Sequence, residues 1–250
     1  MTLDQHLAAL RGSGAALRAA AAEAGPDAKV PTCPAWDVGK LVTHQGMVHR
    51  WAAANLRRER DHKTSRSRAE AAAASDLLEW FTDGLDALVD TVLVTADDAK
   101  AMVFLNDAPP PRRFWARRQA HETTIHSVDA VAAVLGRWPT AADVSIDPVL
   151  AADGIDELLG GFVTRGRGGL PATEPYTLLV RTVDTGHAWT LRVGDGPIVT
   201  TAGATDTPDA AFSGGAVQLY LSLWNRADEM SVTGPAGLLA RWRSGIRIRW

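Results

Sequence analysis

The chain has 250 residues, of which 46% are hydrophobic and 22% are charged, a composition typical of one large globular domain or of a full domain with a smaller one. Its 26 basic and 29 acidic residues give a net charge of −3, which argues against a nucleic-acid partner. The sequence has no stretch of about 18 apolar residues and no secretory signal, so we expect a cytoplasmic protein without a membrane partner. Cys33 is the single cysteine, which excludes an internal disulfide and any site built from several cysteines.

Apolar residues recur with the period of a helix in several stretches of the first half. Asp37 is a good N-cap for one of these helices, and Gly136 is a good terminating residue for another. Residues 62–68 are polar and predict a loop. Helices of this length favour an antiparallel four-helix bundle over residues 1–145. The expected helices cover residues 3–24, from Asp37 to about 58, about 68–94 and about 113–135.

The periodicity changes from helical to strand-like after residue 170. Residues 146–170 are interpreted as a connector, with a helix over 148–162 and a hinge rich in Gly and Arg at 165–169. Residues 171–250 predict a small α+β domain, so the whole chain is assigned to the α+β class. The expected strands of this domain are 176–183, 187–193, 197–201 and 230–233, and its expected helices are 214–226 and 235–244.

Two histidines and a glutamate form a candidate metal site. His44 falls in the same helical row as Leu41 and Val48, so we expect its ring to point into the bundle. Glu122 and His126 are four residues apart and lie one above the other on their helix. Two imidazoles and one carboxylate from facing helices could hold a divalent metal, most naturally zinc, and leave a coordination position open. The same pattern also fits a hydrogen-bonded core histidine beside an ordinary helical Glu–His pair.

Other chemical motifs are weaker. The sequence His121-Glu122 followed by His126 has three residues between glutamate and the second histidine, whereas a zincin motif needs two, so a zincin is rejected. Cys33 precedes a helix in a loop bounded by prolines, and we interpret it as a packed small residue. Trp36 is interpreted as aromatic packing at the start of the same helix.

Two segments of the chain resemble the mycothiol-dependent maleylpyruvate isomerase family. They are residues 30–51, VPTCPAWDVGKLVTHQGMVHRW, and residues 117–130, RRQAHETTIHSVDA. The later segments LAADGIDELL (150–159) and LSLWNR (221–226) are similar to its connector and C-terminal domain. The resemblance implies a DinB-like bundle followed by a sterol-carrier-like α+β domain. It also implies a divalent metal, usually zinc, held by His44, Glu122 and His126.

The resemblance further implies that mycothiol, a low-molecular-weight thiol, is a cosubstrate. A metal keeps a coordinating thiol as thiolate near neutral pH. In the isomerase of this family, the thiolate adds to the double bond of maleylpyruvate, the bond rotates, and elimination gives fumarylpyruvate. In relatives that keep the adduct, the enzyme is an S-transferase. We therefore expect a small electrophilic substrate.

Several further residues match family positions. Arg226 is expected to bind substrate carboxylates, because the planar guanidinium fork binds a carboxylate bidentately. Arg118 and His49 are candidates for cofactor binding, and Arg118 lies one turn before Glu122, so it could instead support that ligand. Asp153 could reach the pocket or cap a helix.

Two other functions stay open from the sequence. One is a non-catalytic, metal-containing small-molecule binding protein, which a fourth protein ligand on the metal would favour. The other is a metal-dependent hydrolase, which needs a general base beside a metal-bound water. The evident carboxylate, Glu122, is already used as a ligand in our interpretation, so the hydrolase ranks third.

Overall fold

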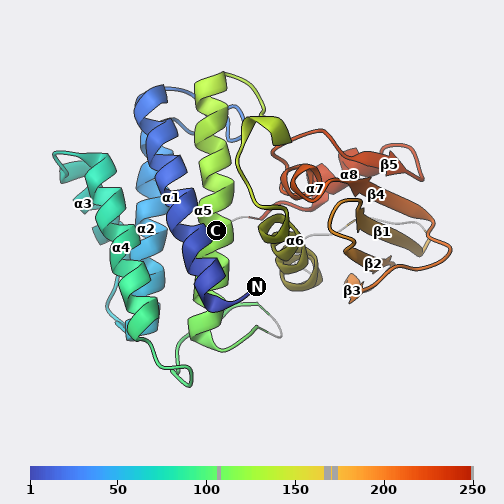
Figure 1. The fold of residues 1–250 in the computed structure, drawn as a ribbon, viewed down its shortest axis with the longest axis horizontal. Coiled ribbons are helices and arrows are strands. Elements are labelled where there is room, and N and C mark those ends of the chain that lie inside the picture. The colour runs from blue at the N-terminus through green and yellow to red at the C-terminus, as the bar shows by residue number, and fades with distance from the viewer. Residues whose placement is uncertain (106–107, 166–169, 171–173, 249–250) are drawn as a thin grey trace. The chain divides into compact units, whose positions relative to one another are not determined.

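The computed structural model of the chain describes residues 1–105, 108–165, 170 and 174–248. It divides into two compact units. The first comprises residues 1–104 and 108–139, and the second contains residue 105 and the described residues from 140 onward. Figure 1 shows helices in the first unit and a sheet with helices in the second. Within the described ranges, none of the helices has both the length and the apolar content needed to cross a membrane.

Local sequence signals set the ends of the helices in the first unit. The Thr2 side chain accepts a hydrogen bond from the backbone of Gln5, whose side chain in turn accepts one from the backbone of Thr2. Asp37 caps the next helix by accepting from the backbone of Lys40 at 2.9 Å. Gly136 ends the last helix with φ +64°, a left-handed conformation that favours glycine. The helices are α1 (Leu3–Ala24), α2 (Val38–Arg57), α3 (Thr64–Ala73), α4 (Leu77–Val94) and α5 (Pro111–Leu135).

The long helices α1, α2, α4 and α5 form the bundle. Contacts at successive levels show that α1 runs parallel to α5 and that α2 runs parallel to α4. The two pairs run in opposite directions, as the colours along the helices in Figure 1 show. The contact pairs are His6–His121, Ser13–Thr124, Arg50–Trp80 and Arg57–Thr91.

The helices α2 and α4 approach closely at Gly46. A Cβ at this position would overlap the ring of Trp80. The guanidinium of Arg50 lies 3.8 Å from the centroid of a Trp80 ring and donates to the Trp80 carbonyl oxygen at 2.6 Å. Two residues of α2, Gly46 and Arg50, therefore contact Trp80 of α4.

The expected single helix over 68–94 is wrong, because the chain breaks into α3 and α4. The Asp76 side chain accepts hydrogen bonds from the backbones of Leu78 and Glu79, so it starts a new helix at that point. The expected loop over 62–68 is also wrong in part, since α3 begins at Thr64. The break allows the chain to return, so that α4 can run parallel to α2.

The second unit is built on a sheet with the strand order β3-β2-β1-β4-β5. Neighbouring strands pair antiparallel except β1 and β4, which are parallel, with Leu178 opposite Ala210. Its strands are β1 (Tyr176–Thr182), β2 (Ala188–Val193), β3 (Val199–Ala202), β4 (Ala210–Gly214) and β5 (Ser231–Thr233).

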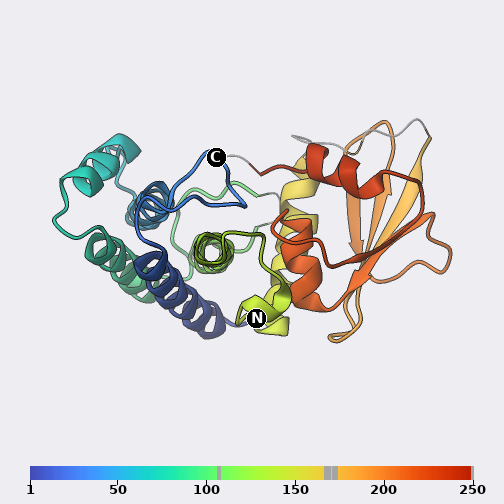
Figure 2. The same ribbon diagram turned by 90° about the horizontal axis from the view of Figure 1, so that it is seen from above.

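Helices of the second unit gather on one face of this sheet (Figure 2). The ring of Phe212 on β4 packs edge-on against Trp242, which is fully buried and donates to the Leu223 carbonyl oxygen at 3.0 Å. The core of this unit therefore lies between the sheet and its C-terminal helices. The helical segments are Ala141–Asp143 (one 3₁₀ turn), α6 (Pro148–Asp156), a π-helical turn over Glu157–Phe162, a 3₁₀ turn over Val163–Arg165, α7 (Ala216–Leu223) and α8 (Leu238–Gly245).

The α+β class and the N-terminal helical bundle are confirmed, with local differences in the second unit. The strand β4 was not expected, and the helix expected over 214–226 is shortened to α7, because Asn225 adopts φ +60° just after it. The helix expected over 148–162 changes to a π-helical turn after Asp156. Most of the expected hinge, residues 166–169, lies outside the described residues.

Candidate metal centre

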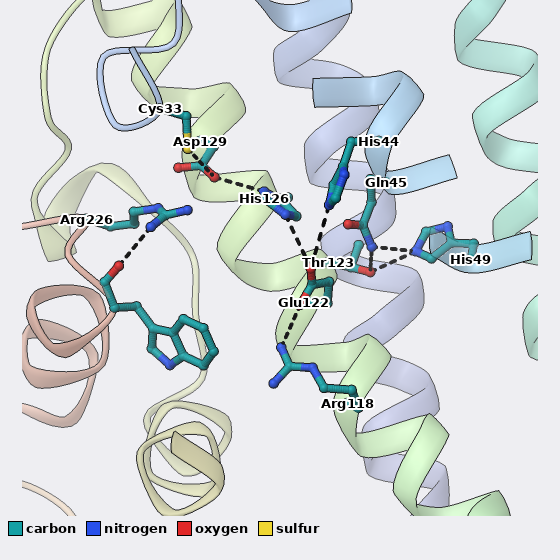
Figure 3. A network of polar contacts seen from close by, with 11 residues as sticks. Cys33, His44, Gln45, His49, Arg118, Glu122, Thr123, His126, Asp129 and Arg226 are labelled. Atoms are coloured by element: carbon teal, nitrogen blue, oxygen red, sulfur yellow. Dashed lines mark hydrogen bonds and ion pairs between the residues drawn. The ribbon is translucent and has the colours of Figure 1, made fainter. Parts of the chain in front are cut away.

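His44 on α2 and Glu122 and His126 on α5 converge inside the bundle, with one potential ligand atom of each within 4.8 Å of the others (Figure 3). The Glu122 Oε1 atom lies 3.9 Å from His44 Nε2 and 3.5 Å from His126 Nε2, separations too long for good hydrogen bonds. His44 Nε2 and Glu122 Oε1 are buried, and neither has a hydrogen-bond partner in the described part of the chain. A buried polar atom without a hydrogen-bond partner lowers the stability of the fold. A divalent cation fits this demand, because imidazole nitrogen and carboxylate oxygen are its usual ligands.

The helix directions bring these three side chains together. The spacing of four residues stacks Glu122 and His126 on one face of α5. Because α2 runs opposite to α5, His44 lies at the level of His126, with ring centroids 5.2 Å apart, while His49 lies lower, at the level of Thr123. The structure thus juxtaposes the three residues that the sequence selected.

Behind His126, a buried carboxylate fixes the orientation of its ring. His126 Nδ1 lies 2.9 Å from Asp129 Oδ2, which leaves Nε2 facing Glu122. Asp129 is fully buried and also accepts hydrogen bonds from Thr32 Oγ1 at 2.6 Å and from Cys33 Sγ at 3.6 Å. A carboxylate on the far nitrogen is the usual support of a metal-binding histidine.

Trp36 covers both histidines of the cluster. Its ring centroid lies 4.8 Å from that of His44 and 5.7 Å from that of His126. The loop that carries Trp36 is tied by backbone hydrogen bonds between Val30 and Trp36 and between Trp36 and Cys33. The tryptophan therefore forms an apolar wall of the site as well as packing at the start of α2.

Arg118 holds the other carboxylate oxygen of Glu122. Its Nη2 atom donates to Glu122 Oε2 at 3.0 Å, and Arg118 is fully buried. Burial by itself favours a neutral Glu122, but the charge of Arg118 and the neighbouring histidines outweigh it and hold the pKa of Glu122 well below its usual range. Glu122 is therefore an anion with Oε2 engaged and Oε1 available.

The pKa values of the two histidines in the cluster are shifted in opposite directions. Burial lowers the pKa of His44, with a partial offset from Glu122. Burial opposes the protonation of His126 as well, yet its contacts with Asp129 and Glu122 prevail and raise the pKa of His126 to about 9. In the absence of a metal, a proton on His126 thus occupies the side of the ring that faces Glu122.

His49 belongs to a separate buried network. Its Nε2 atom, Gln45 Nε2 and Thr123 Oγ1 lie 2.9 Å from one another (Figure 3). Burial lowers the pKa of His49 to about 3, so its ring is neutral at physiological pH. The network joins α2 to α5 directly beside two of the candidate ligands, Glu122 and His44. A cofactor-binding role for His49 stays a prediction.

The remaining residues singled out in the sequence are Arg226, Asp153 and His121. Arg226 follows α7 in the second unit, is half-buried, and donates from Nη1 to the Trp224 carbonyl oxygen at 2.8 Å. Asp153 lies on α6 of the same unit. His121 is fully buried on α5, with its ring packed edge-on against His6. The substrate-binding role of Arg226 stays a prediction.

Sequence reasoning missed two residues that support the cluster, Asp129 and Thr32. The spacing of three residues between His126 and Asp129 is a helical neighbour pattern that could have revealed the first. Thr32 reaches Asp129 across 97 residues of chain, and no local pattern signals such a contact.

The fold and the cluster together define a helical-bundle protein with a candidate site for a divalent metal, joined to an α+β unit. Residues 7–131 match the model of the mycothiol maleylpyruvate isomerase N-terminal domain, and residues 149–241 match that of the corresponding C-terminal domain. The chain therefore belongs to the mycothiol maleylpyruvate isomerase family, which confirms the resemblance of residues 30–51 and 117–130.

Similar folds occur among solved structures. The crystal structure of the mycothiol-dependent maleylpyruvate isomerase superposes with a TM-score of 0.63 and 15% identity over 93% of each chain. A mutant of that enzyme with a histidine replaced by alanine superposes with a TM-score of 0.63 and 14% identity, again over 93% of each chain. A search of curated proteins finds no significant match. At these identities, the structural likeness shows the shared fold.

Proposed function

We propose that the protein is a metal-dependent enzyme in which mycothiol adds to a small electrophilic substrate. The observation that carries this proposal is the convergence of His44 Nε2, Glu122 Oε1 and His126 Nε2 in the bundle, two of these atoms having no partner among the described residues. Family membership supports mycothiol as the thiol, and the solved relative is an isomerase that depends on it.

His44, Glu122 and His126 would hold a divalent metal, with zinc the best fit to two imidazoles and a carboxylate. When bound, the metal would lower the pKa of a coordinating thiol and so supply a thiolate near neutral pH. Three protein ligands are the number found in catalytic zinc sites, whereas structural zinc is normally closed by four.

The chain's own residues prepare this site. Arg118 engages Glu122 Oε2 and leaves Oε1 for the metal. Asp129 fixes the His126 ring with Nε2 facing inward. The apolar ring of Trp36 shields the two histidines from water on one side, which strengthens electrostatic interactions within the site.

In the proposed reaction, the thiolate sulfur forms a bond to one carbon of an activated double bond. The π electron pair of the double bond then moves onto the conjugated carbonyl. Rotation about the resulting single bond followed by expulsion of the thiolate gives the isomer. If a proton is added to the carbon instead, the thiol stays attached and the reaction is an S-transfer. We assign Arg226 the role of binding a carboxylate of the substrate, because a guanidinium matches that group bidentately.

The test compares the wild-type chain with single alanine variants of His44, Glu122 and His126. We expect close to one divalent metal per wild-type chain by elemental analysis, and mycothiol-dependent turnover of maleylpyruvate or of another electrophile in a panel. Each variant should lose metal and turnover together. The control is His187→Ala, which changes an exposed histidine of the second unit and should keep both.

Other outcomes would point elsewhere. A variant that lost its metal but kept full thiol-dependent turnover would contradict the proposal. Hydrolysis of an ester without any thiol would favour a metal-dependent hydrolase. Metal binding without turnover of any electrophile would favour a small-molecule binding protein.

A further inference from the structure

A continuous row of polar side chains runs along one face of α5. The residues are Arg118, Glu122, His126 and Asp129, whose spacings of four, four and three place them on neighbouring turns. Each contacts the next: Arg118 Nη2 lies 3.0 Å from Glu122 Oε2, Glu122 Oε1 lies 3.5 Å from His126 Nε2, and His126 Nδ1 lies 2.9 Å from Asp129 Oδ2 (Figure 3). The two ligands from α5 therefore lie between a buried cation and a buried anion.

Burial makes the net charge of this row important. Arg118 and Asp129 are fully buried, and Glu122 is 3% exposed. Asp129 accepts hydrogen bonds on both oxygens, as an ionised carboxylate does. One guanidinium and two carboxylates leave one negative charge, while His44 and a metal-bound His126 are neutral. Arg68 also acts electrostatically on His44, but it is exposed, so solvent screens its charge.

A divalent cation changes the sign of this balance. With the metal bound, the row and the metal carry one net positive charge, which one singly charged ligand would neutralise. Because uncompensated charge is costly inside a protein, an anionic ligand is favoured over a neutral one. Without Arg118, the loaded site would already be neutral and would have no such preference.

We propose that Arg118 is a specificity-determining residue, whose buried charge makes the loaded site select an anionic ligand such as a thiolate over a neutral ligand. The inference rests on the proposed metal-binding role of His44, Glu122 and His126. It gives Arg118 a function beyond holding the carboxylate of Glu122. It also explains how the site could favour thiolate without a cationic side chain that touches the sulfur.

The experiment measures ligand preference on the cobalt-loaded full chain, without any electrophile. The two probes are 2-mercaptoethanol, which binds as an anionic thiolate, and imidazole, which binds as a neutral ligand. The visible spectrum of Co²⁺ reports both titrations at one pH. The measured quantity is the ratio of thiolate affinity to imidazole affinity.

Arg118→Met removes the charge and keeps a side chain of similar length. We expect it to lower the ratio by about tenfold to a hundredfold, the range for one charge a few ångströms away in a partly polarisable interior. Arg118→Lys keeps the charge and should hold the ratio within about threefold. If Arg118 only positions Glu122, the two affinities will fall together in Arg118→Met. An unchanged ratio in that variant overturns the proposal.

A second variant keeps the proposal testable if Arg118→Met does not fold or does not hold cobalt. Asp129→Asn removes a buried negative charge from the other end of the row, so the ratio should rise several-fold, opposite to the effect of Arg118→Met. Absence of a rise overturns the proposal. If the wild-type chain does not bind cobalt, the metal site and this inference are refuted together. If the affinity ratios change as expected but the chain does not catalyse thiol addition, only the enzymatic function is refuted.

Discussion

Metal affinity should depend steeply on pH because a proton and the metal compete for His126. The pKa of His126 is raised to about 9 in the metal-free protein by its contacts with Asp129 and Glu122, against the effect of burial. A metal needs the free Nε2 atom of this ring, so binding must displace the proton. His44, whose pKa is lowered by burial, and Glu122, whose pKa is held well below its usual range, need not lose a proton near neutrality.

The size of the effect follows from the distance between pH 7 and this pKa. At pH 7, about one chain in a hundred has an unprotonated His126, so the apparent metal affinity should be about a hundredfold weaker than above pH 9, which corresponds to roughly 3 kcal/mol. The affinity should rise tenfold per pH unit from pH 7 to 9 and then level off. A titration against a chelator of known affinity, at pH 6 to 10, measures this slope.

The stability of the metal-free protein should show the opposite trend. The ordinary pKa of histidine is about 6.5, so the raised pKa of His126 stabilises the fold fully below pH 6.5, and this contribution is lost as the pH rises through 9. The loss should total about 3 kcal/mol in the free energy of unfolding, measured by urea denaturation of metal-free chain. A metal affinity that is independent of pH between 7 and 9 would refute the reasoning, as would a metal-free stability that increases over the same range.

Three substitutions test the surroundings of the site. Thr123→Val removes the α5 hydroxyl that contacts Gln45 and His49 of α2. It should lower the free energy of unfolding by about 1–3 kcal/mol and leave the metal content unchanged. An unaltered stability in urea would count against the network. Gly46→Ala should destabilise by about 1–3 kcal/mol, because its methyl group overlaps Trp80, whereas Gly12→Ala on an exposed face should stabilise by up to about 1 kcal/mol; equal melting temperatures for both variants would contradict this packing argument. Cys33→Ser keeps a hydrogen-bond donor in place and should retain the metal and thiol-dependent turnover; loss of metal on elemental analysis would show that the ligand set is incomplete.

Helix periodicity predicted the bundle because α1 and α4 each bury one apolar face, although α5 is buried on almost every side between residues 114 and 130. The same reasoning placed His44 on the inward face of α2, and the spacing of four residues stacked Glu122 and His126 on α5. The structure brings these three side chains together. It failed at the break between α3 and α4, since the alanine run there favours helix throughout. The Asp76 N-cap was the local signal against that prediction.

Contacts between segments that lie far apart along the chain could not be predicted from the sequence. The strand β4 has the sequence AAFSG, which lacks β-branched residues, and it forms because pairing with β1 and β5 satisfies its backbone. The links from Thr32 to Asp129 and from Gln45 to Thr123 depend on how helices pack after folding, and periodicity carries no information about such partners. The sequence therefore predicts the inward faces of the helices but not which polar groups meet between them.

The network of Gln45, His49 and Thr123 also bears on the order of folding and metal acquisition. The bond between Gln45 and Thr123 joins positions 78 residues apart, so the complete ligand set exists only after α2 and α5 have packed. Because this network joins the two helices through protein groups alone, we expect the chain to fold without a metal and the proposed metal to bind afterwards. Small metal-dependent domains behave differently, since they are unfolded until the ion binds. The supply of metal in the cell would then determine the fraction of active protein while leaving the amount of folded protein unchanged.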